Sequence, residues 1–226
     1  MIRFDNVTKT YHGRKFEKTV FSDLSFTIKK GESIGICGAN GAGKSTLMRL
    51  IAGIDKPSSG NVIKTISTSW PIGYASIFQG SLTGADNLRF LARTYDRPIQ
   101  ELIDYVEDFA QLGKFMRQPV KTYSAGMSAR LAFGVSLAFE FECYLVDEVA
   151  GAGDERFQAR ADAEMRARRE RSTLIMTSHS PAMLQSFCDR GAVLYGGSLI
   201  WFDDIAEACE VHSRLQNRAM KKFINS

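Results

Sequence analysis

The sequence predicts an α/β fold built around a phosphate-binding loop, and three observations lead to this prediction. Apolar runs of strand length alternate with helical segments along most of the chain. A glycine-rich loop at 38–45 joins one of these runs to a helix. The 226 residues are enough to bury a sizeable core. We therefore expect one domain over 1–226, with an antiparallel β part at the N-terminus and a helical subdomain inserted at about 81–140.

Residues 1–30 alternate between apolar and polar side chains, which is typical of strands with one buried face. The expected strands cover 2–4, 20–21, 24–28 and the apolar run 33–37. His12–Gly13 predicts a turn between the first two strands, and Lys29–Glu32 predicts another before the last. A helix is expected from Ser45 to about Ile54, followed by a break at Pro57–Gly60 and a further strand.

The pattern changes to helical periodicity between about 81 and 123. Two apolar faces are expected there, one made by Leu88, Leu91 and Tyr95 and the other by Leu102, Tyr105, Val106 and Phe109. The α/β pattern then returns, with helices expected at 125–139, 157–169 and 205–223 and strands at 144–146 and 173–176. Gly196–Gly197 lies between two further apolar runs and predicts a hairpin.

Composition and charge exclude several classes of protein. The net charge is +4 and the basic residues are spread along the chain, whereas a nucleic-acid-binding protein concentrates them. The densest basic stretch, Arg160–Arg171, is interleaved with acidic residues and is typical of a solvated helix face. The longest apolar run, Leu131–Phe139, is far shorter than the roughly 20 residues of a membrane-spanning helix, and no signal peptide opens the chain. We expect a soluble protein with no nucleic-acid partner, whose membrane contact goes through another protein.

The cysteines lie far apart in the sequence and do not show the Cys-x-x-Cys spacing. They are Cys37, Cys143, Cys188 and Cys209. Because Cys37 and Cys143 fall within apolar runs of strand length, we expect buried thiols in a reducing cytosol.

The segment from Gly38 to Ser45 carries the strongest chemical signal. It fits the pattern Gly-x-x-x-x-Gly-Lys-Ser/Thr and lies between a predicted strand and a predicted helix, which is the context that a phosphate loop requires. Its glycines let the backbone fold around an anion with successive N–H groups pointing inward, and the helix adds its positive N-terminal end. Lys44 would reach the β- and γ-phosphates, and the Ser45 hydroxyl would ligate Mg²⁺.

A phosphate loop needs an acidic partner for its metal at the end of a neighbouring strand. The apolar run 143–146 ends in Asp147 and Glu148. Asp147 would hold Mg²⁺, directly or through water, and Glu148 would polarise the attacking water. His179 follows the predicted strand 173–176, where it could reach a γ-phosphate, whereas His12 and His212 lack such a setting and are expected on the surface.

One more segment separates the possible families. Tyr123-Ser124-Ala125-Gly126-Met127 precedes Asp147 by some twenty residues and opens a helix, where a serine alone would indicate only an N-cap. Together with the phosphate loop, the acidic pair, Asp154 and His179, it resembles the nucleotide-binding domain of ABC transporters. The order and approximate spacing match over essentially the whole chain.

The resemblance implies a role for each of these residues. ATP would be bound by Tyr11, Gly38, Ala39, Asn40, Gly41, Ala42, Gly43, Lys44, Ser45, Thr46 and Gln79, with Tyr11 stacked on adenine. Mg²⁺ would be bound by Ser45, Gln79 and Asp147, and catalysis would depend on Lys44, Glu148 and His179. In this family two subunits meet head to tail, so Ser124, Ala125, Gly126 and Met127 would complete the partner's site and Asp154 would span the dimer interface.

Departures from the general ABC pattern indicate a branch. The signature usually reads Leu-Ser-Gly-Gly-Gln, and here Ala125 and Met127 replace a glycine and the glutamine, while Val149 stands where proline is usual. The segment after Gln79 is also short, which leaves the role of Gln79 open. These variants, together with the run Phe78-Gln79-Gly80-Ser81-Leu82-Thr83-Gly84, resemble the ATPases that export capsular polysaccharide across the inner membrane of Gram-negative bacteria.

The resemblance implies an ATP-hydrolysing homodimer that drives capsular polysaccharide export. It would lie at the cytoplasmic face of the inner membrane, bound through integral-membrane permease subunits and linked indirectly to envelope proteins of capsule export. Export of O-antigen, teichoic acid or another polymer is the alternative cargo. A soluble ABC-type ATPase acting on nucleic acid or ribosomes is an alternative of a different class.

Overall fold

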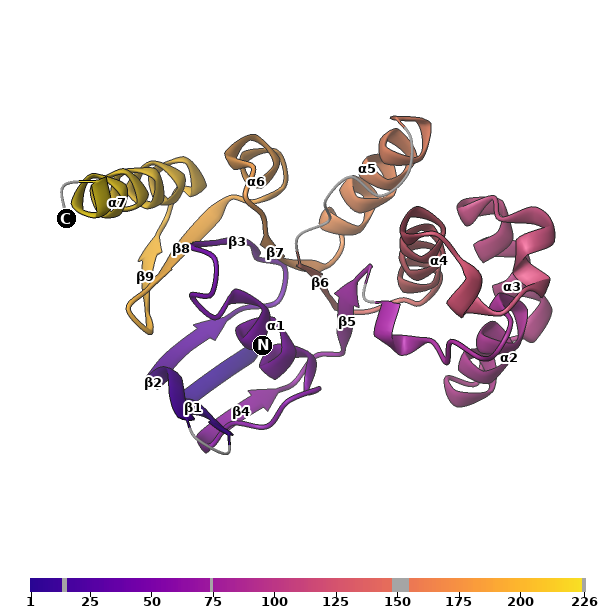
Figure 1. Cartoon of the computed structure of the whole chain (residues 1–226), viewed down its shortest axis with the longest axis horizontal. Helices are drawn as coiled ribbons and strands as arrows, with labels where there is room; N and C mark the ends of the chain where they lie inside the picture. The colour runs from indigo at the N-terminus through magenta and orange to yellow at the C-terminus, as the bar shows by residue number, and fades with distance from the viewer. Residues whose placement is uncertain (14–15, 74, 148–154, 225–226) are drawn as a thin grey trace. The chain divides into compact units, whose positions relative to one another are not determined.

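A computed structural model describes residues 1–13, 16–73, 75–147 and 155–224 (Figure 1). The chain divides into two compact units. The first unit comprises Met1–Pro71, Phe141–Glu148 and Arg168–Ser226. The second unit comprises Ile72–Glu140 and Val149–Ala167. Each unit is built as its sequence pattern indicates, strands and flanking helices in the first and helices in the second.

An antiparallel sheet opens the first unit. Its strands are β1 (Ile2–Gly13), β2 (Phe16–Ile28) and β4 (Ser59–Lys64), in the order β2-β1-β4. The turn expected at His12–Gly13 is wrong, because both residues belong to β1 and pair with Glu17 and Phe16 of β2. Cross-strand contacts extend the ladder this far: the hydroxyls of Thr10 and Thr19 lie 3.0 Å apart, and His12 Nδ1 lies 3.6 Å from Glu17 Oε2.

The larger sheet orders its strands β5-β6-β7-β3-β8-β9. These strands are β3 (Ser33–Gly38), β5 (Thr68–Ile72), β6 (Cys143–Asp147), β7 (Thr173–Thr177), β8 (Arg190–Tyr195) and β9 (Ser198–Phe202). The central strand β3 is buried along its whole length and pairs in parallel with β7 and β8. The predicted hairpin is confirmed: β8 and β9 are antiparallel, and Gly196 and Gly197 both have positive φ, at 56° and 80°.

Strand β5 has no counterpart among the strands expected from the sequence. It contains Pro71, which cannot donate a ladder hydrogen bond and is therefore found on edge strands. The sheet order places β5 at an edge. Ser69 of β5 is fully buried, and its hydroxyl accepts a hydrogen bond of 2.9 Å from the Leu145 N–H of β6. A strand that uses a side chain for pairing leaves little trace in apolar periodicity.

Helices α1 (Lys44–Ala52), α6 (Pro181–Phe187) and α7 (Ile205–Ile224) complete the first unit. The short helix α6 was not expected; it begins with Pro181 at its first turn and with Ser180 accepting the Met183 N–H. Helix α7 approaches β3 closely at Gly35, where a Cβ atom would lie 2.5 Å from Ile205 Cδ1. No helix in the described part of the chain is long and apolar enough to cross a membrane.

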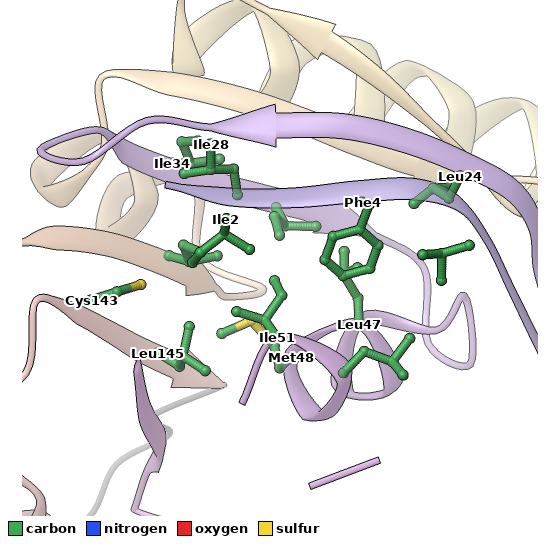
Figure 2. Packing of buried hydrophobic residues seen from close by; sticks show 14 of the residues in the cluster. Ile2, Phe4, Leu24, Ile28, Ile34, Leu47, Met48, Ile51, Cys143 and Leu145 are labelled. Atoms are coloured by element: carbon green, nitrogen blue, oxygen red, sulfur yellow. The ribbon is translucent and has the colours of Figure 1, made fainter. Parts of the chain in front are cut away.

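Helix α1 contributes buried side chains to the hydrophobic core of the first unit, where they pack with residues of both sheets. Figure 2 shows its side chains Leu47, Met48 and Ile51 facing Phe4 of β1. All of these residues are at most 1% exposed. The core cluster continues from α1 to Cys143 and Leu145 of β6, so α1 packs against both sheets. Burial of this apolar stripe is what fixes the start of α1, where the phosphate loop ends.

The second unit is built from helices α2 (Gly84–Thr94), α3 (Ile99–Ala110), α4 (Ala125–Ala138) and the larger part of α5 (Glu155–Arg169). Short helical turns lie at Ala75–Ile77, Gly113–Arg117 and Val120–Thr122. Phe109, Phe133 and Phe157 form its aromatic centre, with ring centroids 5.4 to 6.0 Å apart.

Most of the apolar faces expected in the second unit are buried. Leu88 and Leu91 of α2 and Leu102, Val106 and Phe109 of α3 are at most 7% exposed. Tyr95 departs from the expectation: it follows the last turn of α2 and is 45% exposed, although its ring centroid lies 4.9 Å from that of Phe139.

The basic stretch 160–171 is largely a solvated face, as expected, with one exception. Arg168 is only 8% exposed, and its guanidinium lies 5.8 Å from the ring centroid of Tyr144; both residues belong to the first unit. Two neighbours in the stretch form ion pairs, Arg160 with Asp108 and Arg169 with Asp189.

We expect Phe4→Ala to lower the free energy of unfolding by about 3–5 kcal/mol, because it removes a buried ring that packs on α1. Phe16→Ala is the matched control, since Phe16 lies in the same sheet and is 64% exposed; it should change stability by less than about 0.5 kcal/mol. Urea unfolding of both variants measures the difference. Equal effects would contradict the packing described here.

Candidate nucleotide-binding site

The phosphate loop follows β3 and ends in the first turn of α1. Gly41 and Gly43 have φ values of 75° and 111°, in the region that favours glycine. Gly43 is required for a second reason, because a Cβ atom there would lie 2.3 Å from Val20 Cγ1 of β2. The loop can therefore curl tightly against β2 only with glycine at 43.

Lys44 lies within this loop as a buried cation. The residue is 6% exposed, and its ammonium donates hydrogen bonds to the carbonyl oxygens of Gly38 at 2.8 Å and Ala39 at 3.3 Å. These bonds close the loop over the start of α1. The first turn of α1 begins at the same place, and the backbone N–H groups and positive end of a helix N-terminus favour an anion.

A cavity of about 700 Å³ opens on the loop. It is lined by Tyr11, Lys18, Val20, Asn40, Gly41, Gly43, Lys44, Ser45, Thr46 and His179, all from the first unit. Its volume is in the range of small-molecule and cofactor sites. The structure thus brings together Tyr11, most of the expected phosphate loop and His179, which are separated by more than 160 residues in the chain.

Two lining residues were not expected from the sequence. Lys18 and Val20 lie on β2, and Lys18 is the cross-strand partner of Tyr11. The pairing of β1 with β2 is what carries them to the cavity. With the pairing register known, the position of Tyr11 would have identified Lys18.

Asp147 lies at the carboxyl ends of the parallel strands, where β3 ends and the phosphate loop begins. It ends β6, Thr177 ends the neighbouring strand β7, and β7 pairs with β3, which ends at Gly38. The Thr177 hydroxyl donates a hydrogen bond of 2.6 Å to Asp147 Oδ1 and so fixes the carboxylate. The ligands of open α/β sheets bind at this carboxyl edge of the parallel strands.

The chemistry of this edge suits Mg²⁺. Ser45 is exposed at the start of α1 and offers a hydroxyl oxygen, and Asp147 offers a half-buried carboxylate. Hydroxyl and carboxylate oxygens are hard ligands, and Mg²⁺ combines one or two of them with substrate phosphates and water. The donor set therefore fits the metal that the sequence implies.

His212 of α7 is not the surface residue expected from the sequence. It is half-buried, and burial lowers its pKa, with the nearby charges of Lys44 and His179 lowering it further. Helix α7 runs along β3 toward the phosphate loop, from Ile205 beside Gly35 to Cys209 beside Cys37, which the sequence pattern alone does not reveal. His12, in contrast, is exposed as expected, with a side-chain exposure of 69%.

The four cysteines are free and buried, as expected. Cys37 Sγ, one residue before the phosphate loop, lies 3.8 Å from Cys209 Sγ of α7. Burial is the main cause that raises the pKa of each thiol, to about 12 for Cys143 and Cys188.

The residues expected to act in trans belong to the second unit. Ser124 is the N-cap of α4, and its hydroxyl accepts a hydrogen bond of 3.2 Å from the Met127 N–H. Ser124 and Ala125 are exposed. A Cβ atom on Gly126 would meet no heavy atom within 4 Å among the described residues, so packing within the chain does not explain this glycine.

Gln79 also belongs to the second unit and is exposed. Asn87 of α2, which is 3% exposed, fixes its backbone: its Oδ1 accepts the Gln79 N–H at 2.8 Å and its Nδ2 donates to the Gln79 carbonyl at 3.1 Å. The sequence pattern did not single out Asn87. Glu148 and Asp154 lie outside the described residues.

When pH is lowered, we expect the free energy of unfolding to decrease more in the native chain than in the variant His212→Asn. The pKa of His212 is lowered in the folded state, so below its unfolded value of about 6.5 the unfolded state binds this proton more readily. The His212 contribution is thus present above about pH 6.5 and is lost as pH falls through the folded pKa. Urea unfolding at pH 7.5 and 5.5 measures the two losses, with the exposed His12→Asn as control. Equal losses in all three proteins would contradict the burial of His212.

Comparison with known proteins agrees with this geometry. The sequence matches the family model described as ABC transporter over residues 21–151. The ATP-binding protein BexA of Haemophilus influenzae is 45% identical, over 96% of this chain and 100% of its own length. The capsule polysaccharide export ATP-binding protein CtrD of Neisseria meningitidis serogroup B (strain ATCC BAA-335 / MC58) is 46% identical, over 95% of this chain and 100% of its own length.

Solved structures agree on the fold. The dimeric structure of a post-hydrolysis state of the ATP-binding cassette MJ0796, bound to ADP and Pi, superposes with a TM-score of 0.76 over 90% of this chain and 98% of that one, at 21% identity. The predicted fold class and the predicted resemblance to capsule-export ATP-binding proteins are both confirmed. This chain belongs to the ABC transporter family, as one of its ATP-binding and ATP-hydrolysing proteins.

Proposed function

We propose that this chain hydrolyses ATP to drive the export of a capsular polysaccharide across the inner membrane. One observation carries the proposal: the chain is 46% identical to CtrD, named for capsule polysaccharide export, over the whole length of that protein. The chain would act as a single ABC ATPase domain over 1–226 with a helical subdomain inserted at about 81–140. It would be a peripheral protein at the cytoplasmic face, held there by integral-membrane permease subunits, without nucleic-acid partners.

The phosphates of ATP would lie in the phosphate loop. Support comes from the cavity on the loop, from the buried ammonium of Lys44 beside it and from the start of α1. Tyr11 would stack on the adenine, while Gly38–Thr46 surround the phosphates through backbone N–H groups and the Lys44 charge.

Hydrolysis joins a water oxygen to the γ-phosphorus and breaks its bond to the β–γ bridging oxygen, which releases ADP and inorganic phosphate. Glu148 would orient the water and accept its proton. Lys44 would stabilise negative charge on the γ-phosphate oxygens, and His179, which lines the same cavity, would contact them. Because little covalent chemistry falls to the protein, positioning and charge supply most of the rate.

Mg²⁺ would be held by Ser45 and Asp147, with Gln79 as a third group. When bound, it supplies positive charge that neutralises the β- and γ-phosphate oxygens. Thr177 supports this assignment, since its hydrogen bond holds Asp147 at the carboxyl edge of β6.

A homodimer would complete two such sites. Ser124, Ala125, Gly126 and Met127 of one subunit would contact the γ-phosphate bound by the other, with Asp154 between them. The exposure of Ser124 and the open space beside Gly126 support the proposal, because a ligand or a partner subunit can approach this backbone. Envelope proteins of capsule export would be linked only indirectly, through the permease.

Deletion of the gene in its own organism should abolish the surface capsule and leave polysaccharide inside the cell. The native chain should restore export, whereas Lys44→Ala should not, because it removes the point charge of the phosphate loop. Sugar analysis of the surface polymer measures the outcome. An intact capsule with loss of O-antigen, teichoic acid or another polymer would replace the proposed cargo. Normal surface polymers throughout would refute the proposed export function.

We expect Glu148→Gln to keep ATP binding while lowering turnover by roughly 10²- to 10⁴-fold, the range for losing a general base. ATP affinity and phosphate release, measured on the purified variant, separate the two effects. Glu142→Gln is a control, because Glu142 is a half-exposed carboxylate paired with Lys30, and it should leave turnover unchanged. Normal turnover of Glu148→Gln would show that another group activates the water.

Ser124→Arg should bind ATP as a single subunit but fail to dimerise with it, because the long side chain would block the partner's γ-phosphate. Mixing this variant with Lys44→Ala leaves one composite site doubly damaged and the other intact. Sedimentation and phosphate release of the mixture provide the measurement. Recovery of hydrolysis on mixing would support shared sites, and full activity of Ser124→Arg as a monomer would refute them.

A further inference from the structure

The ring of Tyr11 is fixed by its hydroxyl group. Tyr11 lies on β1 and lines the cavity, and its hydroxyl donates a hydrogen bond of 2.9 Å to Asp55 Oδ2. The same hydroxyl lies 3.4 Å from Thr46 Oγ1 in the first turn of α1. The tyrosine side chain is thus attached to residues at both ends of one helix.

Asp55 is itself held rigidly. Its side chain is 13% exposed, and Oδ1 accepts a hydrogen bond of 2.9 Å from Arg49 Nη2. Its backbone N–H donates to the Arg49 carbonyl at 3.2 Å, just after α1 ends at the left-handed Gly53. Both carboxylate oxygens therefore have a partner, and the carboxylate is fixed relative to the helix axis.

Lys9 completes the arrangement around the ring. Its ammonium lies 3.9 Å from Asp55 Oδ2 and 4.9 Å from the centroid of the Tyr11 ring. It also donates a hydrogen bond of 2.8 Å to the carbonyl of Lys56. One cation thus contacts both the carboxylate and the aromatic ring, which restricts rotation of the tyrosine further.

Helix α1 connects these contacts to the phosphate loop. It begins at Lys44, which lines the cavity, and Asp55 follows its C-terminal end. The Tyr11 ring is therefore fixed by the same rigid element that begins at the phosphate site. A flat ring held at a constant distance from a phosphate loop is what a nucleotide requires for its base and its phosphates to bind together.

We propose that Asp55 is a positioning residue for the nucleotide base, acting through the hydroxyl of Tyr11. The inference rests on the proposed function, in which Tyr11 stacks on adenine. Without Asp55 the tyrosine regains rotational freedom that must be lost again each time ATP binds. Immobilising a side chain of this kind corresponds to an affinity change of about two- to tenfold.

The test compares Asp55→Ala, Tyr11→Phe and the double variant in steady-state hydrolysis of ATP. Each should raise KM for ATP by about two- to tenfold with kcat within about twofold of the native value. The double variant should be no worse than either single one, because both remove the same hydrogen bond. Tyr11→Phe keeps the Asp55–Arg49 pair, so it remains informative if Asp55→Ala does not fold. Asp5→Ala is the control. Asp5 lies on β1, as Tyr11 does, but its carboxylate pairs with Arg3.

Inorganic triphosphate is the second readout, since it lacks a base. Its inhibition constant should stay unchanged in Asp55→Ala and Tyr11→Phe. Weaker inhibition by the same factor as for ATP would show that Asp55 acts on the phosphate loop through α1, and would overturn the inference.

Tyr11→Ala separates the inference from the proposed function beneath it. If this variant binds ATP normally, the stacking of Tyr11 on adenine is refuted. If Tyr11→Ala raises KM while Tyr11→Phe and Asp55→Ala do not, stacking stands and only the role of Asp55 is refuted.

Discussion

The buried ammonium of Lys44 imposes the constraint on which the nucleotide-binding edge of the first unit depends. Removing a cation from water is costly unless acceptors replace the water, and here the carbonyl oxygens of Gly38 and Ala39 do so. They can reach Lys44 only because the loop curls back over the start of α1. That curvature needs the positive φ values at Gly41 and Gly43 and the absence of a side chain facing Val20. The burial of the Lys44 charge therefore depends on the conformation of the loop, and the loop conformation depends on its close packing against β2.

The start of α1 is in turn fixed by packing far from the loop. Leu47, Met48 and Ile51 lie in a core shared with β1 and β6, so both sheets hold the helix in place. A rigid helix gives the loop a fixed N-terminus, and the same helix carries Arg49, which holds Asp55 near Tyr11. In this unit the hydrophobic core thus determines geometry at the surface that binds phosphate.

How much the sequence predicts depends on how local each feature is. The phosphate loop, the hairpin at Gly196–Gly197 and the capped start of α4 are set by consecutive residues, and all were expected. Lys18, Thr177 and His212 reach the phosphate-binding edge through strand pairing or a distant helix, which no local pattern encodes. The wrong turn at His12–Gly13 has the same origin, because the length of β1 is decided by its cross-strand partners. Strand β5 was missed because it contains Pro71 and pairs through the Ser69 side chain, and helix α6 has only seven residues, about two turns.

The burial of the native thiols has a practical consequence for labelling. All four cysteines are buried, and their raised pKa values leave little thiolate at neutral pH, which is the form that reacts with maleimides. A single cysteine introduced at an exposed position would therefore be modified selectively without first removing the native ones. Fluorophores or spin labels placed in each unit would then measure the distance between the units with and without nucleotide.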